Sequence, residues 1–147
     1  MFNQLIAENR VLFAEKFASW QEAVAAAAEP LVRDGAIDAS YIDAMIDSIL
    51  THGPYIVIAP NVAMPHAQGG NSGVHQTAIS FMRVKEPVAF SDSPEHAAQL
   101  LFVLASIDSE NHLQMLQALV EAISEEGFLE ALATVESIDE LNRLLKN

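Results

Sequence analysis

The chain has 147 residues and a mass of 15.9 kDa, a size that predicts one domain spanning residues 1–147. Lysines and arginines number 7 against 20 aspartates and glutamates, so the formal net charge is −13, which argues against binding to nucleic acid or to an anionic membrane surface. The hydrophobic fraction of 51% predicts a folded core rather than disorder. Because the chain has no cysteine, disulfides, thiolate catalysis and cysteine-ligated metals are excluded.

The sequence shows no signal for export or for membrane insertion. The first residues lack a basic segment followed by a long apolar run. No window approaches the roughly 20 apolar residues that a membrane span requires. The longest weakly charged stretch, residues 53–80, is interrupted by prolines and glycines. We therefore expect a cytoplasmic protein that does not insert into the membrane.

The first part of the chain predicts two helices. Ser19 and Glu22 have the spacing of a capping box, and apolar residues then recur with helical period over residues 20–32. Pro30 falls inside this pattern, where a proline kinks or ends a helix. A second helix is expected over residues 39–50, with one apolar face formed by Tyr41, Ile42, Met45, Ile46, Ile49 and Leu50.

The middle of the chain predicts strands. Residues 55–59 form a short β-rich run, residues 77–84 alternate in the manner of a strand, and residues 87–90 are expected to form a short edge strand. Residues 98–104 form an almost uninterrupted apolar run, which is typical of a central strand covered on both faces. The sequence therefore predicts a sheet of four to five strands.

The last part of the chain returns to helical patterns. A helix over residues 111–124 is expected to begin at Asp108 or Ser109 and to present an apolar stripe formed by Leu113, Leu116, Leu119, Val120 and Ile123. A shorter helix follows over residues 127–134, and a capping box at residues 137–140 opens a terminal helix. Helices thus bracket the strands, which predicts an α/β fold: a single domain with a mixed sheet flanked by helices.

The chemistry available to the chain narrows to histidines, carboxylates and hydroxyls. No two histidines have the spacing that places both on one helical face, so a metal site would have to be assembled from distant segments. No nucleophile elbow, phosphate-binding loop or dinucleotide fingerprint occurs. Residues 69–73 are rich in glycine but lack the lysine of a phosphate loop, and they predict a flexible turn before a strand. The candidate residues are His52, His66, His75, His96 and His112.

His66 differs from the other histidines in its setting. Pro65 has a fixed φ and holds Met64 in an extended conformation, so the histidine is carried on a stiff turn. The small Ala67 leaves space beside the imidazole ring. Local composition alone leaves two interpretations open, a functional histidine and a loop histidine without a role.

His112 is the second candidate, because it lies in the first turn of a predicted amphipathic helix. The amino end of a helix disfavours imidazolium, and its free N–H groups favour a bound anion. The alternative is a half-buried histidine with no function. His52, His75 and His96 lie near turns or strand starts, and we predict them to be surface residues without companions.

Residues 53–67 resemble the phosphorylation-site signature of the mannitol/fructose-type enzyme IIA domains of the phosphoenolpyruvate-dependent sugar phosphotransferase system. The core of that signature is apolar-Ala-apolar-Pro-His followed by a small residue, and Val62 through Ala67 match it. The resemblance extends along nearly the whole chain, and Asn111-His112-Leu113 fall where the family has its second histidine. It implies the three-layer α/β/α fold of mannitol-type IIA domains.

The resemblance also implies a function. His66 would accept a phosphoryl group from the carrier protein HPr as a tele-phosphohistidine and pass it to a cysteine of a IIB component, which serves the membrane component IIC. His112 would stabilise the phosphoryl group and the His66 ring, and Met64, Pro65 and Ala67 would form the substrate-binding surroundings of the acceptor. The family implies no metal and no cofactor. The oligomeric state is not set by the sequence, and a homodimer is one option.

One departure from the family bears on the sugar. Mannitol- and fructose-type members usually carry an arginine late in the second helix, where this chain has Asp47-Ser48-Ile49. The lead-in Gly53-Pro54-Tyr55 instead resembles the ascorbate-specific branch, so we predict a role in ascorbate uptake, with mannitol- or fructose-like sugars as the alternative. Two further hypotheses about the function stay open: a regulatory IIA-like module that signals by its phosphorylation state, and a metal-dependent hydrolase.

Overall fold

The fold was analysed in a computed structural model that describes residues 1–67 and 72–146. Helices and strands follow one another along the described chain in this order: α1 (Phe2–Ala7), β1 (Val11–Ala14), α2 (Trp20–Arg33), α3 (Ala39–His52), β2 (Val57–Ala59), β3 (Asn61–Ala63), β4 (Ala78–Ala89), the 3-10 helix η1 (Pro94–His96), β5 (Ala97–Ala105), α4 (Ser109–Ile123), α5 (Phe128–Thr134) and α6 (Ile138–Leu145). None of the helices in these two ranges combines the length and the apolar character that crossing a membrane requires.

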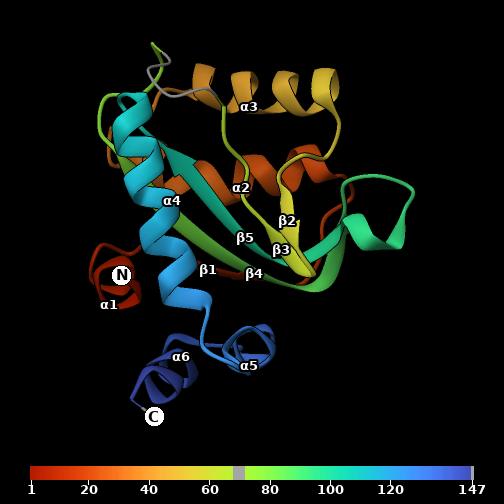
Figure 1. The fold of residues 1–147 in the computed structure, drawn as a ribbon, viewed down its shortest axis with the longest axis vertical. Coiled ribbons are helices and arrows are strands. Elements are labelled where there is room, and N and C mark those ends of the chain that lie inside the picture. The colour runs from red at the N-terminus through yellow and green to blue at the C-terminus, as the bar shows by residue number, and fades with distance from the viewer. Residues whose placement is uncertain (68–71, 147) are drawn as a thin grey trace.

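The described strands form one mixed sheet of five strands in the order β1-β4-β5-β3-β2 (Figure 1). β4 and β5 pair antiparallel at its centre, while β1 and β3 run parallel to β4 and β5 respectively. Helices α2 and α3 cover one face, and α1, α4, α5 and α6 cover the other. The predicted α/β class with a mixed sheet of four to five strands and flanking helices is therefore confirmed.

Strand β5 carries the two cores of the molecule. Leu101 and Val103 belong to the core beneath α2 and α3, whereas Leu100, Phe102 and Leu104 belong to the core beneath α1 and α4 to α6. All five side chains are fully buried. This alternation confirms the prediction that the apolar run forms a central strand covered on both faces.

The two predicted strands at residues 77–84 and 87–90 are one strand, β4. Pro87 lacks an N–H group for the sheet, but it lies where the register between β4 and β5 shifts between Arg83 and Val88. An irregularity of this kind accommodates a proline within a strand. The prediction of a separate edge strand was therefore wrong.

Two short strands were not predicted, and a third begins later than expected. β1 adds to β4, and β3 follows a tight turn at Pro60 and Asn61. Asn61 has φ of 68°, a left-handed conformation that asparagine tolerates, and its side chain pairs with that of Gln99 on β5 at 3.1 Å. The run predicted over residues 55–59 enters a strand only at Val57, so Tyr55 lies in the loop after α3.

The helix boundaries follow the predicted caps, whereas the predicted apolar faces are partly wrong. The N–H of Glu22 donates to the Ser19 hydroxyl, and α2 continues through Pro30 to Arg33. On α3 and α4, however, Leu50, Leu113 and Val120 are 63%, 57% and 49% exposed. The sheet covers only a narrow stripe of α4, whose buried residues are spaced four apart: Met115, Leu119 and Ile123.

Tyr41 joins α3 to the end of β5. Its side chain is 1% exposed, and its hydroxyl donates to the backbone oxygen of Leu104 at 2.7 Å. The Tyr41 hydroxyl oxygen in turn accepts the N–H of Ala67 at 3.0 Å. Burial raises the pKa of Tyr41 to about 12, although the bond from Ala67 opposes this shift. The hydroxyl therefore stays protonated at neutral pH and connects three segments.

We expect Tyr41→Phe to lower the free energy of unfolding by about 1–3 kcal/mol, because it leaves a buried carbonyl and a buried N–H without a partner. Urea unfolding followed by circular dichroism measures this loss. Thr134→Val is the matched control, since the Thr134 hydroxyl also donates to a backbone oxygen but is exposed. An equal loss in the two variants would contradict the structural role of Tyr41.

Candidate active site

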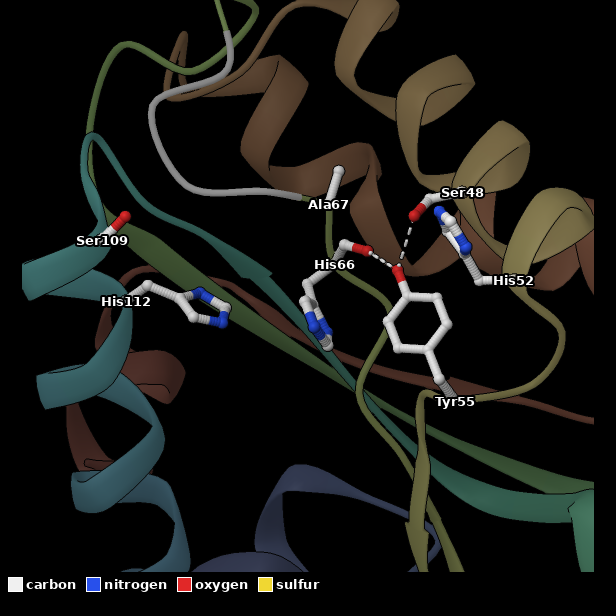
Figure 2. A pocket seen from close by; sticks show the side chains of 7 residues that line it. All are labelled: Ser48, His52, Tyr55, His66, Ala67, Ser109 and His112. Atoms are coloured by element: carbon white, nitrogen blue, oxygen red, sulfur yellow. Dashed lines mark hydrogen bonds between the residues drawn. The ribbon is translucent and has the colours of Figure 1, made fainter.

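A pocket of about 370 Å³ lies between α3, the turn after β3 and the start of α4 (Figure 2). Its lining brings together the two histidines that the sequence singled out. The pocket is lined by Ser48, His52, Tyr55, His66, Ala67, Ser109 and His112.

The backbone on both sides of His66 is bonded to the frame of the fold. On the amino side, the N–H of Leu104 on β5 donates to the Pro65 oxygen at 3.0 Å, and the N–H of Met64 donates to Ile56. On the carboxyl side, the N–H of Ala67 donates to Tyr41. These bonds confirm that the histidine is carried on a constrained turn.

The His66 ring is held in one tautomer by its own turn. Its Nδ1 lies 2.6 Å from the backbone oxygen of Met64. A carbonyl oxygen only accepts, so Nδ1 carries the proton and donates it. Nε2 is then left with the lone pair, which is the nucleophilic site of a neutral imidazole.

His112 faces His66 across the pocket, as Figure 2 shows. The two ring centroids are 5.0 Å apart, with an angle of 41° between the planes. His112 lies in the first turn of α4, which Asp108 caps by accepting the N–H of Asn111 at 2.8 Å. Its buried Nδ1 has no hydrogen-bond partner among the described residues. The free N–H groups of this helix end and the exposed side of the pocket suit an anion.

His66 and His112 both favour the neutral form. Burial lowers the pKa of His66 below its ordinary value of 6.5; the bond to Met64 opposes this shift and the neighbouring His112 adds to it. Burial also lowers the pKa of His112. At pH 7 the neutral form of both imidazoles therefore predominates, and Nε2 of His66 is available to attack an electrophile.

The three residues predicted around His66 have different positions. Ala67 lines the pocket, whereas Met64 and Pro65 are buried behind it and act through their backbone oxygens. Residues 69–71 of the predicted glycine-rich turn lie outside the described residues.

The prediction that the other three histidines lack companions was wrong. His52 is exposed but lines the pocket, with its ring centroid 6.4 Å from that of Tyr55. His75 pairs with Asp38 at 3.0 Å, away from the pocket. His96 is half-buried, and its Nδ1 lies 2.6 Å from the Ser91 hydroxyl.

Two pocket residues were missed as contributors to the site. Tyr55 contacts the backbone oxygen of His66 at 2.6 Å, and Ser48 lies 3.0 Å from the Tyr55 hydroxyl. In the sequence, both residues were considered only within the resemblance to the family. A hydrogen bond between a side-chain hydroxyl and the backbone of a distant turn has no characteristic sequence spacing, so it could not be predicted. Ser48 occupies the place of the arginine expected by analogy, and no lysine or arginine is among the described residues that line the pocket.

The described residues offer no group of three histidines, aspartates or glutamates that could hold a metal ion. His66 and His112 form a pair rather than the start of a larger ligand set. The geometry of the pocket thus gives no support to the hypothesis of a metal-dependent hydrolase. A nucleophilic imidazole beside a second imidazole and a helix end instead suits transfer of an anionic group.

Comparison with known proteins decides the family. Residues 4–147 match the model of the family described as "Phosphoenolpyruvate-dependent sugar phosphotransferase system, EIIA 2". The chain belongs to this family. The resemblance seen in the sequence is therefore confirmed for nearly the whole length of the chain.

Relatives of this EIIA chain include both sugar classes that the sequence suggested. It is 37% identical to the mannitol-specific cryptic phosphotransferase enzyme IIA component of Escherichia coli K12, over 83% of this chain and 82% of the relative. It is 31% identical to the ascorbate-specific EIIA component of Shigella boydii serotype 4 (strain Sb227), over 75% and 71%. Its fold matches the complex of mannitol enzyme IIA and phosphorylated enzyme IIB from E. coli with a TM-score of 0.80 and 29% identity, over 95% of each chain.

We expect the stability of this EIIA chain to fall as pH drops below about 6.5. The folded pKa values of His66 and His112 lie below the unfolded value, so the folded state binds fewer protons there. Their contribution is fully present above pH 6.5 and is lost as pH falls through the folded pKa values.

Urea unfolding at a series of pH values tests this dependence. The double variant His66→Gln/His112→Gln is expected to show a shallower decline than the wild type, whereas His75→Gln is the control for removing an exposed histidine. Identical slopes in the wild type and the double variant would contradict the assignment.

Proposed function

We propose that this EIIA chain is a phosphocarrier in which Nε2 of His66 accepts a phosphoryl group from phosphorylated HPr and donates it to a cysteine of a IIB component. The observation that supports it most directly is the bond from Nδ1 of His66 to the Met64 oxygen, which leaves Nε2 as the nucleophile. Phosphorylation at this atom gives the tele-phosphohistidine expected from the family resemblance. The enzyme is thus a phosphotransferase with a phosphohistidine intermediate.

In the first transfer, the Nε2 lone pair of His66 attacks phosphorus on the donor phosphohistidine. The Nε2–P bond forms as the donor N–P bond breaks, and the donor imidazole keeps the electron pair of the broken bond. The proton on Nδ1 of His66 stays on the bond to Met64 throughout. No external base is therefore needed, which suits a step that depends mainly on positioning and charge stabilisation.

In the second transfer, a cysteine thiolate of the IIB component attacks the same phosphorus atom. The S–P bond forms, the Nε2–P bond breaks and Nε2 recovers its lone pair. The solved complex of mannitol enzyme IIA and phosphorylated enzyme IIB, whose IIA fold is similar, supports a partner of this kind. Because this chain has no cysteine of its own, it supplies the histidine half of the relay.

The phosphoryl group is held by groups on the α4 side of the pocket. His112 lies within reach of an anion on His66, since the ring centroids are 5.0 Å apart. Ser109 and the first N–H groups of α4 lie on the same side. We propose that His112 donates a hydrogen bond to the phosphoryl oxygens, and that the arriving negative charge favours its protonated form.

Incubation with phosphoenolpyruvate, enzyme I and HPr is expected to add one acid-labile phosphoryl group at His66. Replacing the acceptor by His66→Gln removes the Nε2 lone pair, so we expect no label. Mass mapping of the labelled peptide under neutral conditions measures the outcome.

Two further variants serve as controls for this assignment. His112→Gln retains the acceptor, and we expect it to be labelled about ten-fold more slowly, as for a weakened hydrogen bond to a charged group. His75→Gln, which lies outside the pocket, is expected to be labelled at the wild-type rate. Labelling of His66→Gln at the wild-type level would overturn the proposed acceptor.

The sugar is proposed from the family resemblance and not from the pocket, since a IIA protein hands its phosphoryl group to a IIB component. We propose a role in uptake of ascorbate, because the lead-in Gly53-Pro54-Tyr55 resembles that branch. A mannitol- or fructose-like sugar is the alternative, and relatives of both kinds are similar to the chain. A regulatory module that signals by phosphorylation state is the remaining alternative.

Transfer to purified IIB components distinguishes these alternatives. The phosphorylated chain is expected to lose its label to an ascorbate-type IIB at least ten-fold faster than to a mannitol-type IIB, because specificity lies in the protein contact. Rapid quench measures both rates with the same phosphorylated stock. Faster transfer to the mannitol-type component would favour the second sugar class, and no transfer to either would favour a regulatory role.

A further inference from the structure

We infer that Tyr55 is a positioning residue for phosphoryl transfer, which holds the main chain of His66 through its hydroxyl group. The inference rests on the proposed function of His66. It is drawn from three features: the hydrogen bonds of the Tyr55 hydroxyl, the orientation of its ring and its exposure.

The Tyr55 hydroxyl lies 2.6 Å from the backbone oxygen of His66 and 3.0 Å from the Ser48 hydroxyl (Figure 2). A tyrosine hydroxyl has one proton, and a carbonyl oxygen can only accept. Tyr55 therefore donates to His66, and the Ser48 hydroxyl donates to Tyr55. The result is a short chain of hydrogen bonds from α3 to the acceptor residue.

Two tyrosines thereby hold one peptide unit from both sides. The C=O of His66 accepts from Tyr55, and the N–H of Ala67 in the same planar unit donates to Tyr41. A peptide unit held at both its oxygen and its nitrogen cannot rotate without breaking a bond. The Cα atom of His66, and with it the origin of the imidazole side chain, is fixed on the carboxyl side.

The Tyr55 ring also limits the imidazole itself. The ring centroids of Tyr55 and His66 are 5.2 Å apart and the planes are perpendicular, at 88°. His112 lies on the opposite side, as Figure 2 shows. The imidazole is thus confined between Tyr55 and His112, with its Nδ1 bonded to Met64.

Tyr55 is not required by the core of the fold. Its side chain is 38% exposed and belongs to neither core, whereas its neighbour Ile56 is fully buried. Tyr41 differs from it in being buried. The two tyrosines hold the same peptide unit, but only the loss of Tyr41 is expected to cost the fold much stability.

Positioning matters here because transfer requires Nε2 to meet phosphorus in line within a narrow range of distance and angle. Removing the Tyr55 hydroxyl leaves the nucleophile intact but lets the peptide unit move. We therefore expect a slower chemical step without weaker binding of the donor protein.

Tyr55→Phe removes the hydroxyl and keeps the ring, so it is the decisive variant. In rapid-quench transfer from phosphorylated HPr, we expect the rate constant at saturating donor to fall about 5-fold, as for loss of one hydrogen bond. The donor concentration for half-maximal rate and the melting temperature are expected to stay unchanged. Ser48→Ala, which removes only the outer bond, is expected to give a smaller decrease, about 2-fold.

Ser124→Ala is the matched control, because its exposed hydroxyl also lies at hydrogen-bond distance from a backbone oxygen but at the far end of α4. It is expected to transfer at the wild-type rate. An unchanged rate in Tyr55→Phe, or a decrease that appears only with a raised half-maximal concentration or a lowered melting temperature, would overturn the role of Tyr55. Failure of the wild type to be labelled at His66 would instead overturn the proposed function.

Discussion

The arrangement of the site depends on the hydrogen bonds at Leu104, near the end of the central strand β5. Its N–H donates to Pro65, and its C=O accepts from Tyr41, which in turn accepts from Ala67. The turn that carries His66 is therefore bonded on both sides to one residue of the most buried strand. Because Leu104 is itself fully buried, this attachment is shielded from competing water, and the geometry of the turn follows the sheet.

The charge of the whole chain differs from the charge of the side chains that line the pocket. The chain as a whole is strongly acidic, with a formal net charge of −13, so a free anion would be repelled from most of its surface. The described lining of the pocket nevertheless contains neither a carboxylate nor a lysine or arginine, and burial lowers the pKa of His66 and of His112. A pocket without carboxylate, lysine or arginine side chains in an acidic protein suits a phosphoryl group that arrives on a docked partner with a basic surface, where complementary charge mainly accelerates encounter.

Much of the fold could be predicted from the sequence, because its signals are local or periodic. The apolar run of β5, the caps of α2 and α6 and the stiff Pro65-His66 turn all carry such signals, and each is present in the structure. The short strands β1 and β3 are stabilised by their neighbours in the sheet, which no window of three or four residues can indicate. The exposure of Leu113 and Val120 was missed for a related reason, since the width of the buried stripe on α4 is set by the sheet beneath it.

For the site, the sequence likewise predicted individual residues but not how they are arranged in space. The Pro-His turn pointed to His66, and a place in the first turn of a predicted helix pointed to His112; the family resemblance supported both. Their 5.0 Å separation, however, is produced by the parallel pairing of β3 with β5 and the turn into α4. Tyr55 reaches His66 only because α3 ends at Gly53, whose φ of 80° reverses the chain. That reversal places the Tyr55 hydroxyl against the backbone carbonyl of His66, on the side opposite to His112.

The absence of arginine and lysine from the described lining has a consequence for a carrier that must also release its cargo. A permanent cation beside the phosphoryl group would stabilise the phosphorylated state at every pH, whereas burial lowers the pKa of His112, and under the proposed function His112 gains charge when the anion arrives. In that proposal, the proton on His112 is lost again when the phosphoryl group leaves, so the stabilisation disappears with the group that induced it. The proposed charge on His112 would thus be present only together with the phosphoryl group, which would keep the two directions of transfer close in free energy.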